Sequence, residues 1–206
     1  MKTRKNYAFT IFELVVVLAI ITTLVAMIFP VLQKARDTGR KTSCVSNLKQ
    51  IGTALSMYLD DFRHRLPRVG TGRIEWANNL NNIYIDDQNL FYCPTAPGNS
   101  KNWTNLDDNV GVSYGMSFYL NEAILLFPEY DGIENKSTKV LIADADLTIR
   151  PAHQNKSILY FGLTVPTVSD RHNGGSNVLF CDFHVGWQLK TTLESNYPAW
   201  WSSDGL

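Results

Sequence analysis

The sequence lacks the short motifs of the common catalytic and nucleotide-binding folds. It contains no Gly-x-Ser-x-Gly, no P-loop and no Gly-x-Gly-x-x-Gly, and Gly174-Gly175 is typical of a turn rather than of a phosphate cradle. An excess of charge of one sign is absent too, because 19 Lys and Arg stand against 19 Asp and Glu. That balance gives no general attraction to nucleic acid, so no nucleic-acid partner is expected. The neighbouring Cys181 and His184 are the only support for an enzyme, and none is expected.

Cysteine is scarce and occurs in an odd number. Cys44, Cys93 and Cys181 cannot all pair within the chain, and there is no Cys-x-x-Cys. A thiolate zinc site therefore has little support from spacing. A single disulfide is plausible if the domain lies outside the cytoplasm.

Basic residues are missing from a long apolar segment near the N-terminus. No Lys or Arg occurs in residues 9–33, and Glu13 is the only charged residue there. As a helix, residues 9–32 would be about 36 Å long, which exceeds the roughly 30 Å of bilayer hydrocarbon. The segment is also longer than the apolar core of a simple secretory signal. We expect a membrane-spanning helix, which Pro30 should kink or locally loosen.

The residues AFTIFE at positions 8–13 resemble the processing site of type IV prepilins and type II secretion pseudopilins. The resemblance implies that a prepilin peptidase removes residues 1–8 by cutting between Ala8 and Phe9, and that the new N-terminus is methylated. Glu13 takes the place of the glutamate at the fifth mature position. The family prefers Gly before the cut and an aliphatic residue before the glutamate, where this chain has Ala8 and Phe12.

A carboxylate inside a bilayer costs several kcal/mol unless it is paired. Cutting before Phe9 would create an α-ammonium one helical turn from Glu13. The pair could form within one helix or between staggered subunits of a filament, where it would also fix the axial register. The alternative is an ordinary signal anchor in which Glu13 reaches the headgroups.

A second helical pattern follows the apolar segment. Its apolar residues recur with helical spacing and form one stripe, which we expect to pack on a core: Val45, Leu48, Ile51, Leu55, Tyr58, Leu59 and Phe62. Pro67 marks the stop. One helix from about Phe9 to Phe62 is predicted, with Gly39 and Gly52 as weak points.

Further segments resemble a large bacterial group of pilin-like proteins that carries a His-x9-Asp-Gly motif near the C-terminus. They are residues 43–52 (SCVSNLKQIG), 58–61 (YLDD), 91–94 (FYCP), 113–115 (SYG), 140–144 (VLIAD) and 171–185 (RHNGGSNVLFCDFHV). His172 and Asp182 have the spacing of that motif, but Phe183 stands where the group has Gly. The group's biochemical role is poorly defined, so the resemblance supplies no substrate.

An α+β fold is expected, with the long N-terminal helix packed on a small antiparallel sheet. The predicted parts are a leader (1–8), an assembly helix (9–33), its amphipathic continuation (34–66) and a globular domain (67–206). Residues 75–85 are predicted to form a short helix, and residues 94–112 a loop. Strands are predicted at residues 139–143, 157–164, 177–182 and 184–190.

The last two strands should form a hairpin. With Asp182-Phe183 as a two-residue turn, Phe180 would face Val185 and Val178 would face Trp187, which gives one wholly apolar face. Phe183 would then need a positive φ, so a different turn or a bulge is expected.

Two Asp-x-His pairs, Asp170/His172 and Asp182/His184, are candidate ligands of a divalent metal such as zinc, to which Asp144 and Asp146 could add oxygens. Calcium is a second possibility, although His is a poor calcium ligand. The alternative is that these side chains order turns and no cofactor is bound.

The resemblance also places cysteines at positions 44 and 93. A Cys44–Cys93 disulfide would tie the loop region to the long helix and stabilise the fold by about 4 kcal/mol in the chain-entropy model. Two buried free thiols are the alternative, and Cys181 would stay free in both cases.

The expected function is that of a structural subunit of a type IV pilus-like or type II secretion pseudopilus filament. Its partners would be a prepilin peptidase and methyltransferase, other pilin or pseudopilin subunits, and the bacterial inner membrane, which it would cross once with a periplasmic globular domain. The alternative is a membrane-anchored periplasmic binding module for a metal or a glycan. The segment 198–201 (PAWW), which carries two tryptophans, is expected to cover the sheet, dock a neighbour or bind carbohydrate.

Overall fold

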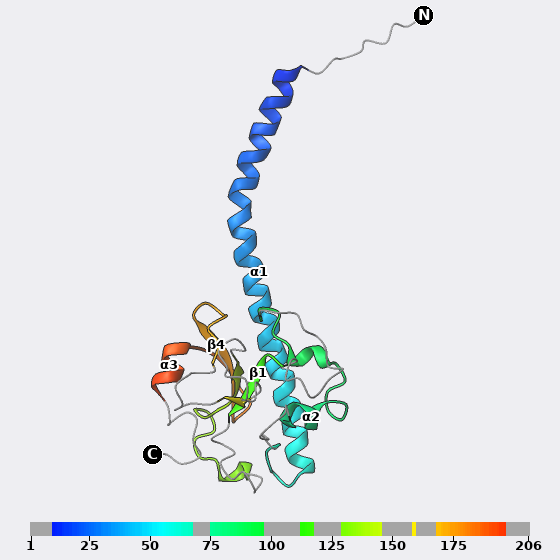
Figure 1. The fold of residues 1–206 in the computed structure, drawn as a ribbon, viewed down its shortest axis with the longest axis vertical. Helices are drawn as coiled ribbons and strands as arrows, with labels where there is room; N and C mark the ends of the chain where they lie inside the picture. Colours follow the sequence, from blue (N-terminus) through cyan, green and yellow to red (C-terminus); the bar gives the residue numbers. More distant parts are fainter. Residues whose placement is uncertain are drawn as a thin grey trace, which may run out of the picture. The chain divides into compact units, whose positions relative to one another are not determined.

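The computed structural model describes residues 10–67, 75–96, 112–117, 129–145, 158–159 and 168–196. The chain forms two compact units, Met1–Gly39 and Arg40–Leu206. A single helix, α1 (Ile11–Asp61), contributes to both units (Figure 1). The long N-terminal helix predicted from the sequence is thereby confirmed. The predicted Ala8, Phe9 and Asp146 lie outside the described residues, as do residues 198–201.

In the first unit, the apolar side chains of α1 are exposed. Pro30 lies inside the helix, which continues through it although proline cannot donate a backbone hydrogen bond. The hydroxyls of Thr22 and Thr23 donate to the carbonyls of Leu18 (2.7 Å) and Ile20 (2.8 Å). Two polar side chains in the apolar segment are thus satisfied by the helix itself.

In the second unit, α1 buries one stripe against the domain. The buried residues follow helical spacing and are Cys44, Leu48, Ile51, Gly52, Ala54, Leu55, Tyr58 and Leu59. Phe62, expected to be the last member of the stripe, is instead 47% exposed and stacks on Tyr58. The helix ends because Arg63 and His64 adopt left-handed φ values, and the His64 N–H donates to the Leu59 carbonyl at 2.8 Å.

The sheet has the strand order β3-β1-β2-β4-β5. Its strands are β1 (Tyr114–Ser117), β2 (Val140–Asp144), β3 (Ile158–Leu159), β4 (Gly175–Phe180) and β5 (Val185–Leu189). The pairs β1–β2, β2–β4 and β4–β5 are antiparallel, and β3 adds a short parallel edge to β1. The predicted α+β class is confirmed. Strand β1 was not among the predicted strands.

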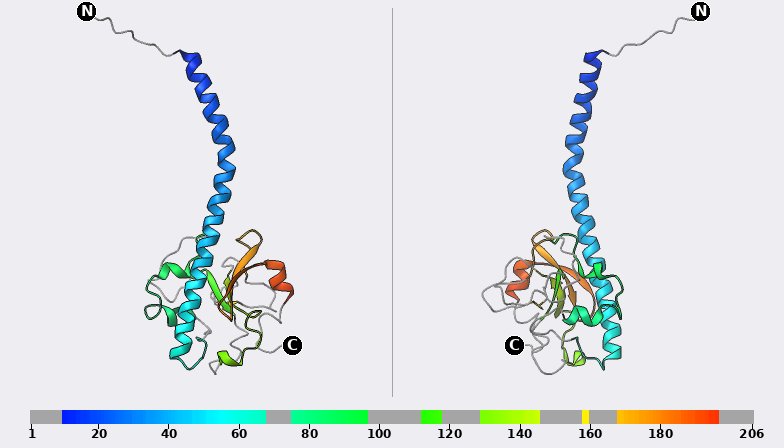
Figure 2. Two further views of the ribbon diagram at one scale, coloured as in Figure 1. Left: turned by 180° about the vertical axis from the view of Figure 1, so that it is seen from behind. Right: turned by 45° about the vertical axis from the view of Figure 1, so that its right-hand side comes forward.

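The sheet lies between α1 and α3 (Lys190–Ser195), as the views in Figure 2 show. The larger core joins the α1 stripe to α2 (Glu75–Leu80) and the 3-10 helix η1 (Gln88–Phe91) through Trp76, Leu80 and Phe91. A smaller core on other sheet positions includes Val140, Val178, Phe180 and Leu193 of α3. A second 3-10 helix, η3, spans Tyr130–Gly132. The predicted helix at 75–85 is shorter than expected, because α2 ends at Leu80 and Asn82 has a left-handed φ.

The predicted β4–β5 register was wrong by one residue. Leu179 pairs with Val185, and Asn177 pairs with Trp187. The cause is Phe183, whose φ of 67° places it in the left-handed region after a turn closed by the Phe183 N–H to the Phe180 carbonyl (3.0 Å). This extra left-handed residue is the mark of a three-residue hairpin loop with a bulge. Because a shift of one residue exchanges the faces of a strand, Val185 packs with the larger core, whereas Phe180 belongs to the smaller one.

Candidate functional site

Two regions carry candidate functional residues, and the first is the beginning of α1. Thr10 donates to Glu13 Oε2 from its backbone N–H (2.9 Å) and from its hydroxyl (2.8 Å), while the Glu13 N–H donates to Thr10 Oγ1 (3.3 Å). This is a capping box, in which a Thr and a Glu three residues later satisfy the free N–H groups of a helix start. The Thr-x-x-Glu spacing could have predicted it from the sequence, which instead drew attention to Glu13 alone.

The apolar surface that follows has no cover within the described part of the chain. Large apolar side chains between Ile11 and Leu32 are 40–83% exposed. Among the described residues, α1 is the one helix long and apolar enough to cross a bilayer. A continuous exposed apolar surface of this length requires lipid or other apolar helices around it. The helix is therefore compatible with a single-pass membrane anchor.

The second region is a buried cluster in the Arg40–Leu206 unit. Cys44 of α1 and Cys93, which follows η1, form a disulfide with their Cα atoms 5.2 Å apart. His172, from the turn before β4, places Nε2 3.3 Å from Cys93 Sγ. Asp144, the last residue of β2, places Oδ2 3.3 Å from the same Nε2. One ligand atom from each of the four residues lies within 4.8 Å of the others.

Backbone contacts position the two polar members of this cluster. The Asn177 N–H donates to Asp144 Oδ2 at 2.9 Å. The backbone of His172 donates to the Gly175 carbonyl (3.1 Å) and accepts from Trp187 Nε1 (2.7 Å). Gly175 permits this turn, because a Cβ there would lie 2.3 Å from the Gln188 carbonyl oxygen. The sheet thus fixes the imidazole and the carboxylate beside the two sulfur atoms.

The four metal ligands predicted from the sequence do not come together. His172 is buried beside Asp144, whereas Asp170 is exposed. Asp182 and His184 form their own pair at the β4–β5 turn, with Oδ1 and Nδ1 2.5 Å apart. Six residues of β4 separate this turn from the His172 turn, which is about 20 Å of extended chain. Asp144 was predicted as an added ligand, whereas neither cysteine was predicted to lie near the site.

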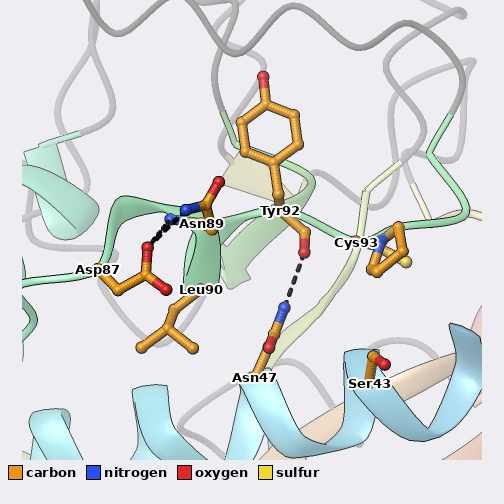
Figure 3. A pocket seen from close by; sticks show the side chains of 8 residues that line it. Ser43, Asn47, Asp87, Asn89, Leu90, Tyr92 and Cys93 are labelled. Atoms are coloured by element: carbon orange, nitrogen blue, oxygen red, sulfur yellow. Dashed lines mark hydrogen bonds between the residues drawn. The ribbon is translucent and has the colours of Figure 1, made fainter.

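A pocket of about 380 Å³ adjoins the disulfide (Figure 3). Its lining comes from one turn of α1 and from the segment around η1: Ser43, Asn47, Asp87, Asn89, Leu90, Tyr92, Cys93 and Pro94. Asn47 bridges the two sides by donating from Nδ2 to the Tyr92 carbonyl at 2.8 Å. Cys93 therefore belongs both to the buried cluster and to the wall of an open pocket.

Two other titratable groups near the core are held in their neutral forms. Burial raises the pKa of the Cys181 thiol to about 12, and the neighbouring Asp182 adds to the effect. A thiol with so high a pKa is a weak nucleophile at neutral pH. Burial, together with the charge of Asp144, also holds the pKa of the Tyr114 phenol well above its usual value. The pKa of the Cys181 thiol is thus shifted away from the range that favours a nucleophilic thiolate.

The chain was compared with family models, curated proteins and solved structures. Residues 33–104 match the sequence model of a family described as "Protein of unknown function (DUF1559)", which covers about a third of the chain. The matched residues include Cys44 and Cys93 but neither Asp144 nor His172. No curated protein matches the chain, and no solved structure does.

Proposed function

We propose that the chain is a structural subunit of a type IV pilus-like or type II secretion pseudopilus filament. The observation that best supports this proposal is the exposed apolar first part of α1, which begins with the Thr10–Glu13 capping box. Before assembly this surface lies in the bacterial inner membrane, with the globular domain on the periplasmic side. In the filament the same surface packs against the equivalent helices of neighbouring subunits.

Processing precedes assembly in this proposal. A prepilin peptidase cuts between Ala8 and Phe9, and a methyltransferase modifies the new N-terminus. The α-ammonium then lies at the positive end of the helix dipole, where a carboxylate is stabilising. Glu13 supplies that carboxylate from the first turn of α1.

In this proposal Glu13 has two roles that can be separated. Both hydrogen bonds from Thr10 go to Oε2, so Oε1 can accept a donor from the terminal amine of a neighbouring subunit. The first role caps the helix and contributes about 1 kcal/mol. The second neutralises charge inside an apolar filament and sets the register between subunits.

Three variants distinguish the roles. Glu13→Gln retains a capping side chain but removes the charge, Thr10→Ala opens the box but retains the charge, and Glu13→Val removes both. We expect Thr10→Ala to assemble, and Glu13→Gln and Glu13→Val to remain as membrane-bound, unassembled protein. Thr22→Ala is the matched control, because that hydroxyl donates to a carbonyl of its own helix, that of Leu18.

Filament yield is measured by shearing and sedimentation after expression in cells that supply the assembly machinery. Normal filaments from Glu13→Gln would contradict the charge-pairing role. Loss of filaments in Thr10→Ala, with Glu13→Gln normal, would reduce Glu13 to a helix cap.

The alternative function, a membrane-anchored binding module, has the pocket beside Cys93 as its specific support. Its polar lining of Ser43, Asn47 and Asn89 is suited to a glycan hydroxyl. Filament formation by the wild-type chain would favour the structural role.

A further inference from the structure

The buried cluster contains an unusual set of side chains for a protein interior. Two sulfurs, one imidazole and one carboxylate converge from α1, the segment after η1, β2 and the turn before β4. The exposed fraction of each residue is 3% or less. Acidic and imidazole side chains are seldom buried so completely unless something pairs with them.

Asp144 is the member whose environment is incomplete. Its Oδ2 accepts the Asn177 N–H, whereas Oδ1 is buried and has no hydrogen-bond partner among the described residues. A buried acceptor left without a partner destabilises the folded state. A cation beside the carboxylate would remove that cost.

The spacing of the ligand atoms fits zinc. Tetrahedral zinc with bonds of about 2.0–2.3 Å to nitrogen, oxygen and sulfur has neighbouring ligands about 3.3–3.8 Å apart. His172 Nε2 lies 3.3 Å from both Cys93 Sγ and Asp144 Oδ2. The two sulfurs alone are too close, because they are bonded to each other. Breaking that bond would let the sulfurs separate by about 1.7 Å through side-chain rotation.

We propose that this cluster is a redox-dependent zinc site: when the Cys44–Cys93 disulfide is reduced, Cys44, Cys93, Asp144 and His172 bind one Zn²⁺. The Asn177 N–H holds the carboxylate in place, as outer hydrogen bonds do in known zinc sites. The pocket that Cys93 lines gives the ion and the reductant their path to the cluster.

The chemistry balances with a dithiol as the reductant. Thiol–disulfide exchange transfers two electrons and two protons from the dithiol, which becomes a disulfide, to the Cys44–Cys93 bond, which becomes two thiols. Zinc binding then releases the two thiol protons to water and leaves the imidazole neutral. In the reverse exchange a disulfide of the same class of partner accepts the two electrons and becomes the dithiol, the Cys44–Cys93 bond forms again, and the ion is released.

The test uses the full chain in detergent micelles, oxidised or reduced with tris(2-carboxyethyl)phosphine, and Co²⁺ as a spectroscopic substitute for Zn²⁺. The reduced protein should bind one Co²⁺, with the sulfur-to-metal charge transfer and the d–d absorption of a tetrahedral thiolate site. Zn²⁺ should displace the Co²⁺ and protect Cys44 and Cys93 from alkylation. The oxidised protein should bind neither ion at this site.

His172→Gln and Asp144→Asn each remove one ligand and should weaken binding by the reduced protein by about tenfold or more. His184→Gln is the matched control, because that histidine also has an Asp partner but lies at the exposed β4–β5 turn. It should leave the affinity unchanged, and equal losses in His184→Gln and His172→Gln would overturn the assignment.

The wild-type comparison remains decisive if a variant fails to fold. Circular dichroism follows the fold through reduction. Reduced protein that stays folded, or refolds, with one bound zinc supports the proposal. Reduced wild-type protein that binds no zinc, whether folded or unfolded, overturns it.

Discussion

The two parts of α1 have the same backbone and opposite surfaces. Between Ile11 and Leu32 the large apolar side chains are exposed, whereas the stripe from Cys44 to Leu59 is buried against the domain. The first part is apolar all round, which is typical of a helix that needs lipid or other helices, and the second is amphipathic, which is typical of a helix on a globular core. Continuity of the helix therefore says nothing about what stabilises each part.

The largest difference between the two parts of α1 is expected when one leucine in each part is replaced by alanine. Leu48 is fully buried, so Leu48→Ala should lower the free energy of unfolding of the domain by about 2–5 kcal/mol. Leu18→Ala should change it by less than about 0.5 kcal/mol, because Leu18 is exposed. Denaturant titration of the full chain in detergent, followed by tryptophan fluorescence, measures both. Equal losses of unfolding free energy in the two variants would contradict the division of α1 into an exposed and a buried part.

The next largest loss of stability is expected from replacing Gly52, a glycine in the buried part of α1. A Cβ at Gly52 would lie 3.1 Å from Leu179 Cδ1, so Leu179 would have to shift to admit even a methyl group, and further for a larger side chain. Gly52→Leu should destabilise the domain by about 1–3 kcal/mol through overpacking. The same titration measures it, and an unchanged midpoint would show that α1 does not pack on β4 as described.

The smallest effect is expected at Gly39, where a Cβ would meet no atom within 4 Å. Gly39→Ala should stabilise the helix by up to about 1 kcal/mol, because glycine loses more backbone freedom than alanine. Slower amide hydrogen exchange in the residues around position 39 is the readout. Faster exchange in the alanine variant would mean that Gly39 is required for a contact of its own.

The sequence predicted those features that depend on local periodicity. The long helix, its buried stripe and the strands β2, β4 and β5 followed from apolar spacing. Strand β1 was missed because Tyr114–Ser117 (YGMS) has only four residues, one of them a glycine, and no β-branched residue, so its sequence gives little strand signal. A two-residue turn would need a positive φ at Phe183, which predicted a different turn or a bulge, and the structure confirms the bulge. The register was wrong because the loop has three residues, which shifts the pairing by one.

The buried cluster was predictable only in pieces. His172 and Asp144 were recognised as potential ligands, and Cys44 and Cys93 as a potential disulfide. Their proximity was not, because Cys93 and His172 are 79 residues apart in the chain. The two Asp-x-His pairs predicted that His172 and His184 belong to one metal site. That prediction was wrong, because the two histidines lie at opposite ends of β4.

The central claim, that the chain is a processed filament subunit anchored through α1, is tested most directly by the intact mass of the protein isolated from membranes. The account predicts a chain that begins at Phe9 and carries one added methyl group. A mass that still contains residues 1–8 would contradict it.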